Sequence, residues 1–303
     1  MSDSLISRIS NTGEEFNIKI GCMNIANAIR DETQNPLYPR IQEIGNMVKT
    51  QQPDVLVMLE AGRNSMGHTW TEMAAEIEKI TNLVYIGIYL VNGTEAPFGK
   101  ALFIDKKSVT YRTFERSWIG DTLYEKWEGD RYGSDIIKVN LYPVRDGKVI
   151  IDREINLWVV HFPLGRAARL DASHTLADSM PPNTVVMGDF NCFHTDKGPE
   201  MIEIITSIWN EQKLDCDWTF KAYKHDLVDV PAKIRGNLPI GSKVMPESEE
   251  NKQNGTITVR FTGMLDRVFT SPDVKTNYTD VVFSHDASDH ALIIANVEYG
   301  QSF

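Results

Sequence analysis

Cysteines and long apolar runs are both scarce in this sequence. The three cysteines, Cys22, Cys192 and Cys216, form no CxxC pair and are too few for a disulfide framework. No apolar run approaches the roughly 18–20 residues that cross a bilayer. The first residues also lack the pattern of a signal peptide. We therefore expect an intracellular protein, cytoplasmic or nuclear, without a membrane segment.

Positive charge is also in short supply. The 303 residues include 31 Lys and Arg against 42 Asp and Glu, which gives a formal net charge of −11. This balance argues against a protein that coats nucleic acid through bulk charge, but it allows an enzyme that binds phosphates through a divalent metal. Hydrophobic residues make up 42% and charged residues 24% of the chain. This is the composition of an ordinary globular protein and excludes a disordered or collagen-like chain.

Short apolar strands recur along the whole chain, with helical stretches between them. We expect helices at 38–50, 71–80, 167–180 and 199–212. We expect strands at 16–24, 55–59, 83–90, 100–104, 109–114, 134–142, 155–161, 184–188, 256–262, 266–270 and 291–297. This order predicts an α/β fold of two packed sheets flanked by helices, in one domain.

Two terminal or loop segments, a basic stretch and the tryptophans also carry expectations. Residues 1–15 are expected to be a flexible N-terminal segment before a single catalytic domain, 16–303. Residues 231–254 are rich in Pro, Gly, Ser and Lys and are typical of a surface loop. The stretch 221–243 is expected to be a solvated loop, with a groove for a polyanionic strand as the alternative. The tryptophans at 118, 127 and 158 are expected to pack in the core or on the domain surface.

Polar residues stand directly after apolar strands, and no familiar catalytic motif competes with them. The chain has no nucleophile elbow, no P-loop and no HExxH. In layered α/β folds, ligands gather where strands end. Five strand ends carry polar residues that could do chemistry: Asn24, Glu60, His161, the GDFN run at 188–191 and the SDH run at 288–290. Asp266 is a sixth and weaker candidate. Carboxylates and carboxamides with few imidazoles suit Mg²⁺ or Mn²⁺ better than Zn²⁺.

This ordered set of residues resembles the endonuclease/exonuclease/phosphatase superfamily, the fold of deoxyribonuclease I. The resemblance depends on the order, spacing and strand context of the motifs from Asn24 to His290. It implies a four-layer α/β sandwich, in which two mostly antiparallel mixed sheets pack face to face with helices outside. It also implies Mg²⁺-dependent hydrolysis of a phosphoester, with Mn²⁺ as a possible substitute. The LDRVF run at 265–269 is similar to the motif of tyrosyl-DNA phosphodiesterase 2-type members.

The resemblance assigns roles on the metal side of the site. Glu60 matches the glutamate that binds the divalent metal. Asn24 matches the asparagine that supports this glutamate, and we count Asn24 among the metal-site residues. Asp289 matches an aspartate that faces metal or phosphate and supports His290. Two positions depart from the family pattern: Leu59 stands where many members have Gln, and Ala26 stands where exonuclease III-like members have Asp.

The resemblance assigns further roles on the phosphate side. His161 contacts the scissile phosphate, Asp189 aligns or deprotonates the attacking water, and Asn191 stabilises the transition state. His290 neutralises developing charge, and Asp266 stands in the second shell. Arg166 and Arg169 are expected on the substrate side.

Three functions remain open at this point. A nucleic-acid phosphodiester is the preferred substrate, as in a nuclease or a DNA or RNA end-processing enzyme. The first alternative is a phosphoinositide phosphatase or a sphingomyelinase-like phosphodiesterase. The second is a catalytically silent binding module of the same fold.

Overall fold

The computed structural model describes most of the chain, and the statements below refer to those residues. The described ranges are 16–25, 37–62, 69–90, 99–127, 130–163, 165–179, 181–192, 198–216, 219–228, 243–244, 256–284, 287–288 and 290–301. The predicted N-terminal segment 1–15 lies outside them.

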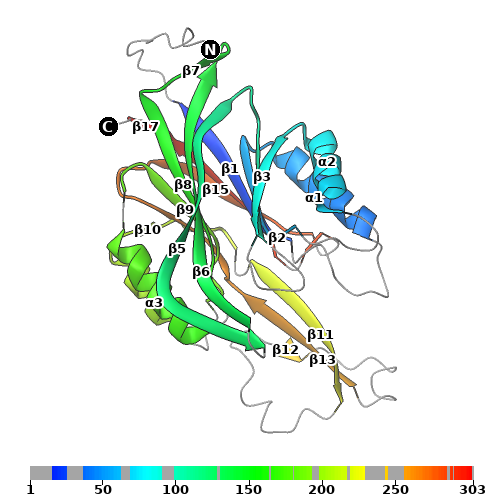
Figure 1. Ribbon diagram of the computed structural model, residues 1–303. Coiled ribbons are helices and arrows are strands. Elements are labelled where there is room, and N and C mark those ends of the chain that lie inside the picture. The colour runs from blue at the N-terminus through cyan, green and yellow to red at the C-terminus, as the bar shows by residue number, and fades with distance from the viewer. Residues whose placement is uncertain are drawn as a thin grey trace.

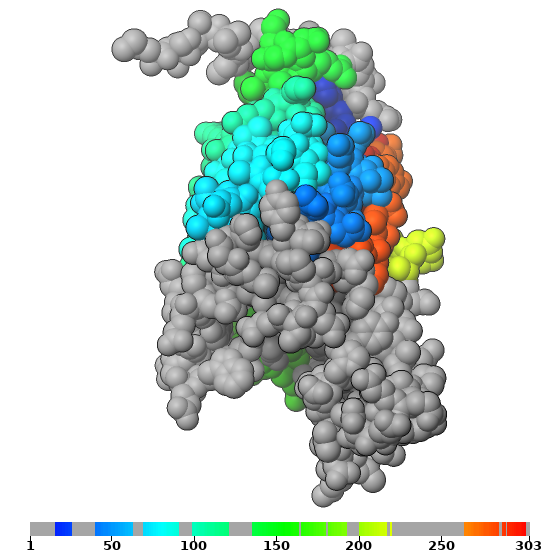
Figure 2. All heavy atoms as spheres, turned by 90° about the vertical axis from the view of Figure 1, so that its right-hand side faces the viewer, coloured from blue at the N-terminus to red at the C-terminus, as the bar shows by residue number. Residues whose placement is uncertain are grey.

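The first sheet has six strands around one parallel pair (Figure 1). Their order is β15 (Thr276–Val282), β16 (Leu292–Glu298), β1 (Asn17–Asn24), β2 (Val55–Ala61), β4 (Gly99–Ile104) and β3 (Val84–Leu90). The pair β1–β2 is parallel and the other pairs are antiparallel. Helices α1 (Leu37–Gln51) and α2 (Trp70–Thr81) cover one face of this sheet, and Figure 2 looks onto that face.

The second sheet has the same plan. Its main path is β10 (Asn210–Glu211), β14 (Asp266–Thr270), β9 (Thr184–Asp189), β8 (Arg153–His161), β6 (Asp130–Arg145) and β5 (Val109–Trp127). The pair β8–β9 is parallel. The short strands β7 (Lys148–Val149) and β17 (Gly300–Gln301) extend the sheet at one end. Helices α3 (Arg166–Asp178) and α4 (Gly198–Thr206) pack on its outer face.

The period of two along each strand builds the layers. In β1, Ile18, Ile20 and Cys22 face the second sheet, while Met23 faces the helices. Strands β2, β4, β6, β8 and β9 alternate in the same way between the central cluster and a helix-side cluster. The result is helices, sheet, sheet and helices, so the predicted four-layer sandwich is confirmed.

Helix α2 shows why the local sequence forms these elements. Thr69 and Glu72 form a capping box at its start, and Asn82 ends it in the left-handed conformation. The buried positions Trp70, Met73, Ala74 and Ile77 have the spacing of one helix face and pack on the first sheet.

The structure differs from the predicted elements at several places. The helix predicted at 199–212 ends at Thr206, because Asn210–Glu211 pairs with β14 as an edge strand. The strands predicted at 109–114 and 134–142 extend much further, to form the long β5–β6 hairpin. Strand β15 was not expected from the sequence, and neither was a third sheet. Residues 221–228, predicted as part of a solvated loop, belong to a strand of that sheet, where they pair with residues 256–262.

That third sheet is small and lies at the end of the sandwich opposite β7 and β17 (Figure 1). It consists of β11 (Phe220–Val228), β13 (Thr256–Gly263) and β12 (Lys243–Val244). Residues 243–244 belong to the predicted loop 231–254, so that part of the loop is a strand. The rest of the loop lies outside the described residues. None of the helices that the structure describes is long and apolar enough to cross a membrane.

At Gly188, the backbones of β9 and β8 lie too close together for a side chain. The φ of this glycine is +144°, and a Cβ there would collide with the carbonyl oxygen of Val160 on β8. We predict that Gly188→Ala lowers the free energy of unfolding by about 3–5 kcal/mol, from backbone strain and overpacking together. Urea unfolding measures this change.

The matched control is Gly147→Ala. Gly147 also has a positive φ, +70°, but no atom lies within 4 Å of the position of an added Cβ. Its substitution should cost only the backbone strain, about 1–2 kcal/mol. Equal losses in the two variants would mean that β8 shifts easily and that the close approach at Gly188 is not a constraint.

Candidate active site

The interior-facing runs of the strands end in polar residues at the same end of the sandwich. Because side chains alternate along a strand, the residue two positions beyond the last apolar one stays on the interior face. In this way Cys22 leads to Asn24, Val159 to His161 and Met187 to Asp189. On strands that run the other way, Lys100, Asp135 and Asp266 lie at this end, each two residues before an apolar interior residue. The apolar core is therefore closed by a polar layer.

Cross-strand register places these groups in one row on the second sheet. Asp135 pairs with His161, His161 pairs with Asp189, and Asp189 pairs with Asp266. Residues that pair directly have side chains on the same face, about 5 Å apart. The row therefore brings three carboxylates and one imidazole together from four strands.

Glu60 reaches the site because of a β-bulge. Leu59 pairs with Lys100 and Ala61 pairs with Gly99, so Glu60 is an extra residue in β2. Its φ is +53°, in the left-handed region. In a regular strand, Glu60 would face the helices, since Leu59 faces the interior. The bulge turns the carboxylate toward the polar layer, and strain of this kind is common at functional sites.

Asn24 joins the carboxylates of the two sheets. Its Nδ2 donates to Glu60 Oε1 and to Asp189 Oδ2, at 3.1 Å each. Nε2 of His161 lies 3.6 Å from Glu60 Oε1 and 3.7 Å from Asp189 Oδ2. The four side chains therefore converge across the gap between the sheets.

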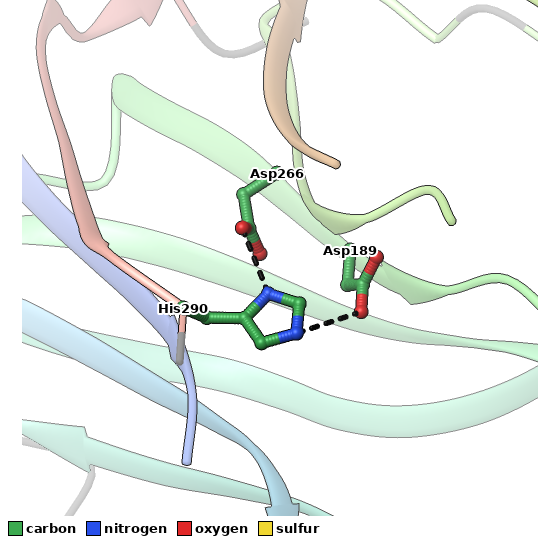
Figure 3. Close-up of side chains that lie close together, drawn as sticks. All are labelled: Asp189, Asp266 and His290. Atoms are coloured by element: carbon green, nitrogen blue, oxygen red, sulfur yellow. Dashed lines mark hydrogen bonds and ion pairs between the residues drawn. The ribbon is translucent and has the colours of Figure 1, made fainter. Parts of the chain in front are cut away.

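His290 lies between two carboxylates (Figure 3). Its Nδ1 is 2.9 Å from Asp266 Oδ2, and its Nε2 is 3.8 Å from Asp189 Oδ2. The main chain of His290 is held as well, because its backbone N–H donates to Ser288 Oγ. The hydroxyl of Ser288 in turn donates to the backbone carbonyl of Asn24. Asp189, Asp266 and His290 offer ligand atoms within 4.8 Å of one another, a set that could hold a metal ion.

Asn191 is fixed beside Asp189. Its backbone N–H donates to Asp189 Oδ1 at 2.8 Å, and its Nδ2 donates to the carbonyl of Phe162 at 2.7 Å. Its φ of +48° lies in the left-handed region that Asn tolerates. The amide is thus held by the turn that follows β9 and by the end of β8.

The two predicted substrate arginines have different surroundings. Both lie in the first turn of α3, directly after the end of β8. Arg166 is exposed, whereas Arg169 is buried with 2% of its surface accessible. Arg169 therefore does not present its guanidinium at the surface in this structure. Asp289, predicted beside the metal and His290, lies outside the described residues, and the carboxylate on Nδ1 of His290 comes from Asp266.

Burial governs the ionisation of the central groups. It lowers the pKa of His161 to about 4, against the opposing attraction of Asp189. Burial also raises the pKa of Asp189, against the opposing effect of His290. His161 is therefore a neutral imidazole at neutral pH, and Asp189 is a carboxylate with little water to stabilise its charge.

Two charged residues of the polar layer were not identified from the sequence. Lys100 of β4 and Asp135 of β6 form a buried ion pair between the two sheets, and Arg116 Nε lies 2.9 Å from Asp135 Oδ2. Burial opposes the ionisation of Asp135, but the two cations outweigh it and lower the pKa of this carboxyl. The sequence does show that each of these charged residues stands two positions before an apolar interior run. It does not show the direction of the strands, which is what places Lys100 and Asp135 at the site.

Comparison with known proteins identifies the class to which this site belongs. The model of the endonuclease/exonuclease/phosphatase family matches residues 21–290, and the chain belongs to that family. The predicted resemblance is confirmed. Family members are generally phosphoester hydrolases that use divalent metals. A search of curated proteins finds no match.

Solved structures share the fold at low identity. An endonuclease/exonuclease/phosphatase family protein from Bacteroides thetaiotaomicron is 14% identical with a TM-score of 0.63, over 95% of this chain and 99% of that one. A mannosyl-6-phosphatase from the same species is 14% identical with a TM-score of 0.60, over 92% and 99%. TDP2 of D. rerio, complexed with a single-strand DNA product, is 14% identical with a TM-score of 0.57, over 93% and 98%.

The ion pair between the sheets gives a prediction about stability. Asp135→Leu would leave the ammonium of Lys100 buried, with 2% of its surface accessible, without its carboxylate, which costs about 3–5 kcal/mol. Lys100→Met should cost less, because Arg116 still compensates Asp135. Urea unfolding, extrapolated to water, compares the two variants.

The double variant Lys100→Met, Asp135→Leu is the control. It shows whether the single variants lose stability because one charge is left without its partner or because side-chain packing is lost. Apolar replacement of a whole buried pair is often neutral, so the double variant should be more stable than Asp135→Leu alone. If its loss equals the sum of the two single losses, the two side chains do not act as a pair.

Proposed function

We propose that this protein is a divalent-metal-dependent phosphodiesterase that hydrolyses a nucleic-acid phosphodiester. The observation that carries the proposal is the convergence of Glu60, Asp189 and two histidines around the amide of Asn24. The comparison with TDP2, which was solved with single-strand DNA, supports the choice of nucleic acid as the substrate class.

The donor set fits a hard divalent cation. Mg²⁺ and Mn²⁺ prefer oxygen ligands, and carboxylates supply them here. Glu60 is the proposed ligand, and Asn24 orients its carboxylate through Nδ2. Asp289, which lies outside the described residues, is the second proposed ligand. Burial raises the pKa of Asp189, and a nearby cation would stabilise its charged form. When bound, the cation supplies positive charge for the phosphate oxygens.

The remaining groups can divide the chemistry of hydrolysis among them. Asp189 is placed to orient water and accept its proton, with its Oδ1 fixed by the N–H of Asn191. Asp266 holds Nδ1 of His290, so that Nε2 is the atom that faces the reacting centre. His161 is neutral and offers one N–H. His161 and the amide of Asn191 are proposed donors to the charge that develops on phosphate. His290 is the third proposed donor, in its imidazolium form, in which Nδ1 donates to Asp266 and Nε2 donates to the phosphate.

The alternatives have less support. A silent binding module has no need to retain convergent carboxylates and imidazoles. The predicted carboxylates Glu60 and Asp189 do converge with His161 and His290. Lipid and sugar phosphoesters, the latter suggested by the mannosyl-6-phosphatase in the comparisons, remain outcomes of a substrate panel of DNA, RNA, inositol lipid, sphingomyelin and hexose phosphates. Cleavage of only the non-nucleic-acid members would overturn the proposed substrate.

The carboxylates of the two sheets give a direct test. We predict that Asp189→Asn lowers kcat on a single-stranded oligonucleotide with Mg²⁺ by about 10²–10⁴-fold, the range for a lost acid–base group. Glu60→Gln should also lower kcat, because it replaces the carboxylate proposed to hold the cation by a neutral amide. Glu203→Gln, an exposed carboxylate on α4, is the matched control and should leave kcat unchanged. Near-normal turnover in Asp189→Asn would remove this residue from its proposed role.

Asp266 acts through His290 and gives a second test. Asp266→Asn keeps the shape of the side chain but removes the charge that faces Nδ1. We expect kcat to fall about 10–100-fold, as for other groups that orient a functional histidine, while KM stays close to its normal value. A rise in KM with unchanged kcat would instead indicate that Asp266 contributes to substrate binding.

A further inference from the structure

Trp118 on β5 occupies the outer end of the row of site residues. It pairs with Asp135 of β6, which pairs with His161 of β8. Directly paired residues share a face of the sheet, so the indole lies on the face that carries His161 and Asp189. The next residue, Ile119, packs on the opposite face among the residues beneath α3. Neighbouring strands are about 4.8 Å apart, so Trp118 lies about 10 Å from His161 along the row.

The ring of Trp118 is left open to solvent. It is 59% exposed, the highest value among the large hydrophobic residues that the structure describes. Three other tryptophans, Trp70, Trp158 and Trp209, are at most 7% exposed. Ligand sites are lined mostly by hydrophobic and aromatic side chains with a few polar groups, and an exposed indole next to the polar row fits that pattern.

Polar contacts hold Trp118 in place from one side. The guanidinium of Arg116 lies 4.5 Å from the centroid of the indole. The same guanidinium lies 2.9 Å from Asp135 and donates to the carbonyl of Leu90 at 3.1 Å. Asp135 is itself paired with Lys100. A chain of contacts therefore runs from the ion pair between the sheets to the exposed ring, so the ring is positioned before a ligand arrives.

We propose that Trp118 is a stacking platform for an unpaired base of a single-stranded nucleic acid whose phosphate is cleaved at the row. This inference rests on the proposed function and names the form of its substrate. Base–aromatic stacking contributes about 1–3 kcal/mol per base and needs no sequence match. It also needs no bulk positive charge, which matters because the chain has a net charge of −11.

The position of the ring favours a base over a sugar. A hexose esterified directly to phosphate would lie at the row itself, next to His161 and Asp189. A base is separated from its phosphate by a whole sugar and so reaches further along the sheet. The separation of two strands between Trp118 and His161 therefore suits a base.

The test compares cleavage of a single-stranded oligonucleotide with that of an abasic oligomer of equal length, with Mg²⁺. We expect Trp118→Ala to raise KM for the oligonucleotide about 5–100-fold, the equivalent of one lost stacking contact, and to leave kcat unchanged. KM for the abasic oligomer should not change. Trp118→Phe should keep most of the affinity, because it retains an aromatic face.

The matched control is Tyr278→Ala. Tyr278 is also exposed, at 46%, and lies under the ammonium of Lys19 at 5.8 Å from its ring centroid, but it is on β15 at the far edge of the other sheet. Its replacement should change neither constant. The melting temperatures of all variants show that the fold is kept.

The outcomes separate the two proposals. If the wild-type protein cleaves no oligonucleotide, the proposed function is wrong and this inference falls with it. If the wild type is active but Trp118→Ala leaves KM unchanged, or raises it equally for the abasic oligomer, then only the stacking role is wrong. A rise in KM confined to hexose phosphates would assign the ring to a sugar instead.

Discussion

The register of the second sheet is the constraint on which the site depends. Trp118, Asp135, His161, Asp189 and Asp266 lie on one face only because five strands pair at fixed positions. A slip of one residue in any pair would turn that strand's functional side chain toward the helices. The packing of the core opposes such a slip, since it would also move Val159 or Met187 out of the central cluster between the sheets. The core therefore fixes the site as well as the fold.

Much of this arrangement could be predicted because the chemistry follows the strands. Asn24, His161 and Asp189 each come directly after an apolar run, and the sequence shows where such a run ends. Glu60 was also found, but the alternation of its strand would direct it at the helices. Only the bulge, which the sequence does not reveal, explains how its side chain reaches the others.

Other parts depend on tertiary structure. Lys100 and Asp135 come just before the apolar interior runs of their strands, and only strand direction places these positions next to the ends of β2 and β8. The contact between Asp266 and His290 joins residues 24 positions apart, so the local pattern showed Asp266 only as a strand start. The edge strand β15 was missed because much of it is exposed and polar, without the alternation that marks a half-buried strand.

The two main sheets follow one plan, with a central parallel pair joined through a helix and antiparallel strands on both sides. The sequence shows no internal repeat, so this likeness is one of architecture alone. Each half contributes side chains to the polar cluster of the candidate site, which lies between the two sheets. A small sliding of one half over the other would change the spacing between Glu60 and His161 while leaving each sheet intact. Packing errors deep between the two sheets should therefore impair chemistry well before they unfold the molecule.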